Sequence, residues 1–241
     1  MKIGIFDSGI GGLTVLKEII RKYPNGQYIY YGDTLHLPYG DKTKEQFFEY
    51  ACHIIEFLIS KQVDKIVIAC GTVSSTIYNE LKEMYDIEII NVVDATISAI
   101  KQEKINNVAV LATSKTIESH VFSKKLNNIN VLEVSCPKFV PYIEQKIGSK
   151  EEILVNYLEQ LKKEKIENII LGCTHYPLLE QDIRSYFPYP VKCYNMGTFV
   201  ADSINIEETT YKLTLYFSKI DEKVKTNIKN ILEREYELIE T

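Results

Sequence analysis

Two cysteines stand at the ends of apolar runs that are typical of buried strands. Cys70 ends the run KIVIAC, and Cys173 ends the run NIILGC. A thiol can take up or release a proton when its surroundings tune it. The segments 63–76 and 166–179 also resemble each other, since both have an early acidic residue, a β-branched strand, the cysteine and then a threonine. This repeat indicates that the two thiols occupy equivalent positions in two related halves.

Two opposed thiols suit a reaction that removes a proton from one face of a carbon and delivers one to the other face. Inverting a stereocentre by deprotonation and reprotonation has that requirement. Asp7 and His175 can hold the thiols in their working protonation states or receive a substrate ammonium. Hydroxyls and free N–H groups at helix starts bind carboxylates without arginine, so we expect an amino-acid or dicarboxylate ligand. The loops supply such hydroxyls from Ser8, Thr72, Ser74, Thr113, Thr116 and Thr174.

Short apolar runs alternate with longer amphipathic ones along the chain. Near-continuous apolar runs are typical of strands that are buried on both faces in parallel sheets. They occur at 2–6, 28–32, 65–70, 87–93, 107–113, 130–136, 168–173 and 191–195. Helical patterns occur at 44–61, 72–85, 150–165 and 175–187. The alternation predicts a doubly wound α/β architecture with mainly parallel sheets.

A weaker second repeat relates residues 2–12 to residues 107–117. Together the repeats predict two pseudo-symmetric α/β domains. We expect residues 1–93 plus about 207–241 to form the first domain, and residues 94–206 to form the second. Ligands of open parallel sheets bind at the carboxyl ends of the strands, which predicts an active site in the cleft between the domains. Both cysteines then lie at helix N-termini, where N–H groups favour a thiolate.

Composition excludes several classes of protein. The net charge of −5 and the low arginine content argue against nucleic acid as the partner, because phosphate binding needs a basic surface. No stretch approaches the roughly 18 apolar residues of a membrane span, and the apolar N-terminal run is too short for a signal peptide. Five cysteines without regular close spacing fit a reducing compartment. We therefore expect a cytoplasmic protein with no membrane partner.

Each of these features also has a plainer interpretation. A cysteine at the end of a buried strand is often only a small apolar residue, and we assign that role to Cys52, Cys136 and Cys193. The segment FDSGIGG lacks the GxGxxG spacing and the Walker lysine of nucleotide-binding loops. A zinc site built from the two strand-end cysteines with His175 and His36 would lack a CxxC or HxxxH pair, so no metal is expected. A Cys-His hydrolase would lack an evident third residue to orient the histidine.

Five segments, spread over most of residues 1–200, resemble in order the signature segments of the bacterial glutamate racemases. They are FDSGIGGLTVLKEI, YYGDTLHLPYGDK, IVIACGTVSS, CPKFVPYIE and LGCTHYPLL. The resemblance implies a cofactor-independent isomerase of two α/β domains that interconverts L- and D-glutamate. It also implies a homodimer and a role in supplying D-glutamate for peptidoglycan, and thus in cell wall biogenesis and cell shape. Residues 212–232 look like the last strand and helix of that family.

The same resemblance implies roles for individual residues. Cys70 and Cys173 match the two catalytic thiols, and Asp7 and His175 match residues that assist them. An acidic residue tends to replace this histidine in aspartate racemases, which favours glutamate. The substrate-contacting positions of the family match Asp7, Ser8, Tyr39, Gly40, Thr72, Thr174 and His175. Asp33 and Glu144 fall in segments where the family carries further acidic residues that can assist. We also expect Gly71, Thr113 and Thr116 to bind the substrate, because they lie in the loops that follow the strands.

One position departs from the family pattern. The family usually reads Cys-Asn-Thr-Ala where this chain reads Cys70-Gly71-Thr72-Val73. The missing amide removes a hydrogen bond to a charged ligand, which contributes about 1.5–3 kcal/mol. Glycine leaves its own N–H free to approach the ligand closely. Two alternatives therefore stay open: a racemase of aspartate or another amino acid, and a non-catalytic amino-acid-binding paralogue.

Overall fold

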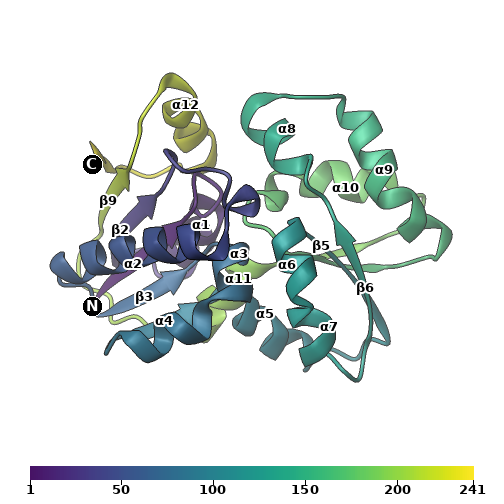
Figure 1. The fold of residues 1–241 in the computed structure, drawn as a ribbon, viewed down its shortest axis with the longest axis horizontal. Coiled ribbons are helices and arrows are strands. Elements are labelled where there is room, and N and C mark those ends of the chain that lie inside the picture. The colour runs from purple at the N-terminus through teal and green to yellow at the C-terminus, as the bar shows by residue number, and fades with distance from the viewer.

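The computed structural model describes residues 1–241 and contains two parallel β-sheets, one in each of two lobes (Figure 1). The sheet of the first lobe has the strand order β10-β9-β2-β1-β3-β4, and all its neighbouring strands run parallel. Its strands are β1 (Lys2–Asp7), β2 (Gln27–Gly32), β3 (Lys65–Ile68), β4 (Glu88–Asn91), β9 (Lys212–Phe217) and β10 (Glu237–Glu240). The two ends of the chain thus share one sheet, and both termini lie in this lobe.

The sheet of the second lobe has the strand order β6-β5-β7-β8 and is also entirely parallel. Its strands are β5 (Asn107–Ala112), β6 (Asn130–Ser135), β7 (Asn168–Leu171) and β8 (Lys192–Asn195). This order repeats the order β2-β1-β3-β4 of the first lobe, with β5 in the place of β1 and β7 in the place of β3. The predicted α/β fold with two pseudo-symmetric, parallel sheets is confirmed.

Strand register determines which residues meet at the edge of each sheet. In the first lobe Phe6 of β1 pairs with Ile68 of β3, so Asp7 and the turn after β3 emerge side by side. In the second lobe Leu111 of β5 pairs with Leu171 of β7. The turns that follow these four strands therefore carry the residues that the sequence singled out for chemistry.

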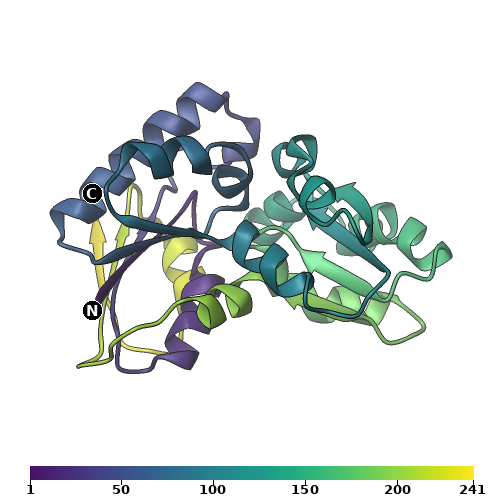
Figure 2. The ribbon, with the colours of Figure 1, turned by 90° about the horizontal axis from the view of Figure 1, so that it is seen from below.

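Helices cover both faces of the sheets (Figures 1 and 2). The helix α2 illustrates why these segments are helical. It buries Phe47, Ala51 and Ile54 at three- and four-residue spacing, which places them on one face. It begins with a capping box between Thr43 and Gln46. The helices are α1 (Leu13–Lys22), α2 (Lys44–Ser60), α3 (Gly71–Thr76), α4 (Tyr78–Met84), α5 (Val92–Ile100), α6 (Ser114–Ser119), α7 (Val121–Lys125), α8 (Phe139–Gln145), α9 (Lys150–Lys163), α10 (Glu180–Tyr186), α11 (Met196–Ser203) and α12 (Glu222–Ile231), with 3₁₀ turns η1 (Tyr39–Asp41) and η2 (Tyr176–Leu179).

Two of the predicted helices are interrupted. The segment 72–85 forms α3 and α4 with a break at Ile77, because Ser75 and Thr76 donate their hydroxyls to the carbonyl of Thr72 and compete with the helical bonds. The segment 175–187 begins with the 3₁₀ turn η2 before α10 starts. As a result Cys70 is the N-cap of α3, whereas Cys173 precedes only a 3₁₀ turn.

The two lobes share one hydrophobic core. A cluster of 35 buried residues includes Val67 of β3 and Ile97 of α5 together with Val110 of β5 and Val200 of α11. The helix α11 packs against both α1 and α5 where the lobes join. This continuous packing fixes the two sets of strand ends relative to each other. No helix is both long and apolar enough to cross a membrane.

Candidate active site

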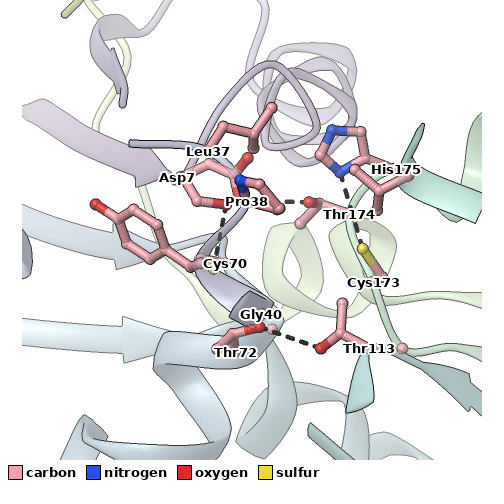
Figure 3. Close-up of a pocket in the computed structure, with 15 residues that line it drawn as sticks. Asp7, Leu37, Pro38, Gly40, Cys70, Thr72, Thr113, Cys173, Thr174 and His175 are labelled. Carbon is pink, nitrogen blue, oxygen red and sulfur yellow. Dashed lines mark hydrogen bonds between the residues drawn. The ribbon is translucent and has the colours of Figure 1, made fainter. Parts of the chain in front are cut away.

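A cavity of about 30 Å³ lies where the strand ends of the two lobes face each other (Figure 3). Its walls combine the turns after β1 and β3 of the first lobe with the turns after β5 and β7 of the second. The lining residues are Asp7, Ser8, Leu37, Pro38, Tyr39, Gly40, Cys70, Gly71, Thr72, Thr113, Val140, Gly172, Cys173, Thr174 and His175. Both cysteines that the repeat paired thus line one cavity.

Cys70 is surrounded by groups that keep its thiol protonated. The side chain is buried, and its Sγ lies 3.7 Å from the hydroxyl of Ser8. Burial, helped by the nearby negative charge of Asp7, raises the pKa of Cys70 to about 12, although the N–H of Val73 and the Ser8 hydroxyl favour the thiolate. From the sequence we expected the helix N-terminus after Cys70 to favour the thiolate, but the loss of solvation on burial has a larger effect on the pKa and favours the thiol.

Cys173 has a different partner, a histidine held by a carboxylate. Its Sγ lies 3.8 Å from Nδ1 of His175, and Nε2 of the same ring lies 2.7 Å from a carboxylate oxygen of Glu144. Burial by itself lowers the pKa of His175, but the contacts with Cys173 and Glu144 raise it well above its usual value. A protonated ring so placed can donate one hydrogen bond to the sulfur of Cys173 and one to the carboxylate of Glu144.

Asp7 connects the first lobe to the second. One oxygen of its buried carboxylate accepts hydrogen bonds from the N–H groups of Gly9 and Gly12 at 3.1 and 3.0 Å. The other oxygen accepts the hydroxyl of Thr174 at 3.3 Å. Burial raises the pKa of Asp7, while the positive charge of His175 and the two N–H groups lower it. The carboxylate thus fixes the glycine loop and faces the cavity.

A row of hydrogen-bonded hydroxyl groups connects the two lobes. The Oγ1 atoms of Thr72 and Thr113 are 3.1 Å apart, and Thr113 Oγ1 is also 3.1 Å from Thr116 Oγ1. Ser75 donates to Thr116 at 3.4 Å. Thr72 and Thr113 line the cavity, whereas Thr116 lies behind them and supports the row. The predicted hydroxyl donors are therefore present, although only some of them face a ligand directly.

Asp33 acts on the cavity through Tyr39. The hydroxyl of Tyr39 donates to Asp33 at 2.7 Å, and Ser218, which follows β9, donates to the same carboxylate at 2.7 Å. The Nδ1 of His36 lies 2.9 Å from it. Asp33 does not line the cavity; it holds the loop whose residues Tyr39 and Gly40 do.

Four lining residues were not predicted from the sequence: Leu37, Pro38, Val140 and Gly172. Leu37, Pro38 and Gly172 adjoin residues that were predicted, but none of the four has a side chain with acid-base chemistry. Leu37 and Val140 supply apolar surface to the cavity from opposite lobes. Three predicted residues, Thr116, Asp33 and Glu144, contact lining residues instead of lining the cavity themselves.

Comparison with known proteins agrees with this geometry. The profile of the Asp/Glu/Hydantoin racemase family matches residues 17–195. A glutamate racemase of Hydrogenobaculum is 38% identical, over 99% of this chain and 95% of that protein. The structure of glutamate racemase from Francisella tularensis in complex with D-glutamate has a TM-score of 0.88 and 30% identity, covering 100% of this chain and 97% of that one. A glutamate racemase isoform from Bacillus anthracis has a TM-score of 0.90 and 28% identity, covering 99% and 96%.

These matches define the class of protein first: an α/β amino-acid racemase whose chain forms two related lobes. The family follows from them, because its profile spans most of the chain and the full-length relative is 38% identical. The chain belongs to the Asp/Glu/Hydantoin racemase family.

Proposed function

We propose that the protein interconverts L- and D-glutamate without a cofactor, using Cys70 and Cys173 as acid and base. The observation that carries the proposal is that thiols from equivalent turns of the two lobes line one cavity. Racemisation needs a proton acceptor on one face of Cα and a proton donor on the other. The relatives named above are glutamate racemases, which supports glutamate as the substrate.

In this proposal Cys173, which contacts His175, acts as the base for one enantiomer, and Cys70, whose pKa is raised by burial, acts as the acid. The Cys173 thiolate takes the Cα proton, and the electron pair of the broken C–H bond moves into the substrate carboxylate. The Cys70 thiol then donates its proton to the opposite face of Cα and becomes a thiolate. The other enantiomer reacts with the roles exchanged.

The remaining lining residues bind and orient the substrate in this proposal. Asp7 is the negative charge of the cavity wall and can receive the substrate ammonium. The hydroxyls of Ser8, Thr72 and Thr174 are donors for the carboxylates. Further contacts come from Tyr39, Gly40, Gly71, Thr113 and His175, with Thr116, Asp33 and Glu144 in support.

The direct test is a screen of free amino acids with the purified chain in deuterated water and no added cofactor. We expect L-glutamate to yield D-glutamate that carries deuterium at Cα, with the highest kcat/KM of the panel. Chiral chromatography and mass spectrometry measure both quantities. Inversion that retains the original hydrogen would rule out proton abstraction, and tight glutamate binding without exchange would favour the non-catalytic paralogue.

A second candidate is a racemase of aspartate or another amino acid, which Gly71 favours. Glycine has no side chain, so no side-chain amide is available from this position. The ligand contact implied by the family's asparagine must then come from another group. A kcat/KM that is higher for aspartate than for glutamate would select this candidate.

Several features of the wider setting are also part of the proposal. We place the domain boundaries near residues 93 and 207, because strands of the first sheet lie within 2–91 and 212–240 and those of the second within 107–195. A homodimer, a cytoplasmic location and the supply of D-glutamate for peptidoglycan are predictions from the sequence and the resemblance. Light scattering of the purified chain tests the first of these.

A further inference from the structure

The turn after β7, which carries Cys173, Thr174 and His175 at the cavity, lacks one of its own hydrogen bonds (Figure 3). The residues on either side of Pro177 each donate their N–H to the carbonyl three positions earlier, at 3.0 Å. The same pattern would join residue 177 to the carbonyl of Thr174, but proline has no N–H. No backbone N–H of the chain donates to this carbonyl, so the backbone of the turn does not hold it.

A hydroxyl from the other lobe takes the place of the missing donor. Thr14 is buried in the first turn of α1, and its Oγ1 lies 2.7 Å from the carbonyl oxygen of Thr174, 160 positions away. The same hydroxyl lies 2.9 Å from the carbonyl oxygen of Gly11, which already accepts the N–H of Thr14 at 3.0 Å. A hydroxyl has a single proton to donate, and Thr174 is the acceptor without another donor. The contact therefore satisfies a buried carbonyl that would otherwise be unpaired.

The rest of this turn also fits closely against the start of α1. A Cβ atom added to Gly11 would stand 2.5 Å from Oγ1 of Thr174 and would also meet the ring of His175. The hydroxyl of Thr174 donates to Asp7 at 3.3 Å. The first lobe thus contacts the turn through its carbonyl, its threonine hydroxyl and its histidine ring, and only the carbonyl contact depends on the side chain of Thr14.

Resting on the racemase function proposed above, we propose that Thr14 is a positioning residue for Cys173. Thr14 does not line the cavity, so it acts through the turn that it holds. The carbonyl of Thr174 belongs to the second peptide group after Cys173, and a rotation there moves Sγ of Cys173 relative to Cys70 of the other lobe. Proton transfer needs the thiol at a defined distance and direction from Cα of the substrate. Loss of the hydroxyl therefore slows the step at Cys173 more than the step at Cys70.

The variants Thr14→Val and Thr14→Ser test the hydroxyl itself. Valine keeps the size of the side chain and removes the hydroxyl, whereas serine keeps the hydroxyl. For the amino acid that the wild-type protein prefers, we expect kcat/KM of racemisation to fall about 10- to 100-fold in Thr14→Val, because displacing a reacting group by about 1 Å has effects of this order. Thr14→Ser is expected to stay close to wild type. Chiral chromatography measures both.

The matched control is Thr96→Val, which makes the same change at another buried threonine. The hydroxyl of Thr96 donates to the carbonyl of Val92 at 2.6 Å within α5, away from the cavity. Its kcat/KM is expected to stay close to wild type. If Thr14→Val does not fold, Thr14→Ala removes the same hydroxyl without placing a methyl group against the carbonyl of Thr174, and the same results are expected of it.

The deuterium isotope effect at Cα shows whether the lost activity lies at Cys173. Both enantiomers, labelled with deuterium at Cα, are assayed in ordinary water. When the step at Cys173 is the slowest, the isotope effect on kcat/KM rises for the enantiomer that Cys173 deprotonates. It falls for the other enantiomer, because Cys70 then removes the Cα proton in a fast step before the slow one. Lost stability alone reduces the amount of active enzyme and changes neither isotope effect.

The outcomes separate this proposal from the function on which it rests. A wild-type protein that neither exchanges nor inverts any amino acid contradicts the proposed function. With an active wild-type protein, the positioning role alone is contradicted if Thr14→Val keeps the wild-type kcat/KM or if Thr14→Ser is as slow as Thr14→Val. A slow Thr14→Val variant whose two isotope effects both stay at the wild-type values contradicts it as well.

Discussion

At the scale of single residues, the main feature of the site is that its two thiols are not equivalent. The fold repeats, but the neighbours of the thiols do not: Cys70 has Asp7 and Ser8 nearby, whereas Cys173 has His175 backed by Glu144. A negative neighbour opposes a thiolate and a positive neighbour favours one. The two thiols therefore lie in different electrostatic surroundings, one beside a carboxylate and one beside a histidine.

The Glu144→Gln substitution tests the charged state of His175. Glu144 raises the pKa of this histidine, so the imidazolium is present below that pKa and is lost as the pH rises through it. Removing the carboxylate charge lowers the pKa, and activity that needs the imidazolium disappears at a lower pH. A hydrogen bond to a charged group contributes about 1.5–3 kcal/mol, which shifts the alkaline limb of kcat/KM by about one to two pH units.

The same lobe offers a matched control for this experiment. Glu133 pairs with His120 at 2.7 Å on the surface, outside the cavity. Glu133→Gln is expected to leave the pH profile unchanged. An alkaline limb that stays in place in Glu144→Gln contradicts the role of the imidazolium.

Residue types and their spacing predicted much of the candidate site. Eleven of the fifteen lining residues were named from loops that follow strands or from the family segments. Gly172 could not be found in this way, because it has no side chain and lines the cavity only through its place beside Cys173. The raised pKa of Cys70 was also missed, since a sequence shows a helix start but does not show how deeply the thiol is buried.

At the scale of elements, the C-terminal segment supports the site from a distance. Strand β9 joins the first sheet beside β2, and Ser218 just after it donates to Asp33. Asp33 in turn accepts the hydroxyl of Tyr39, which lines the cavity. Burial and the nearby Asp33 carboxylate raise the pKa of Tyr39 well above its usual value, so this hydroxyl remains a donor.

The Ser218→Ala substitution is expected to raise KM for glutamate about fivefold with little change in kcat. It removes the 2.7 Å hydrogen bond to Asp33 and leaves the N–H of Leu35 without its acceptor, which loosens the loop that carries Tyr39. The loss of about 1 kcal/mol corresponds to that factor. Steady-state kinetics measures it, with Ser60→Ala at the exposed end of α2 as the control. A fall in kcat alone would contradict a role in holding the binding loop.

The sequence predicted the core strands and the long helices. It did not predict a helix break that depends on side-chain hydrogen bonds, or a short strand that depends on pairing with its neighbour. All eight predicted strands are present, and the most continuous apolar runs among them, β1 and β5, are almost entirely buried. Strand β10 was missed, since its four residues are partly exposed and gain their partner only through pairing with β9. The interruption at Ile77 was missed because it depends on the hydroxyls of Ser75 and Thr76.

At the scale of the whole molecule, the site depends on both lobes being held together. The shared core crosses from one sheet to the other, and the cavity of about 30 Å³ has room for about one water molecule. Glutamate has ten non-hydrogen atoms, so the cavity must widen to admit it.

Thermal unfolding tests whether the two lobes unfold together. Because the core of 35 residues is shared, we expect one cooperative transition, not two. Glutamate at about 100 times its Kd binds between the lobes and stabilises the folded state by about 2.7 kcal/mol, which raises the Tm by roughly 5–10 °C. Calorimetry with glutamate, and with lysine at the same concentration as a control, measures both effects. Two separate transitions would contradict the shared core.

The most direct test of the two-thiol reaction is the rate of glutamate racemisation in the variants Cys70→Ala and Cys173→Ala. The control is Cys136→Ala, which removes an equally buried sulfur outside the cavity. General acid-base groups contribute about 100- to 10,000-fold, so each cavity variant is expected to lose activity by that factor in both directions, while the control stays close to wild type. Racemisation at the wild-type rate in either cavity variant would contradict the mechanism.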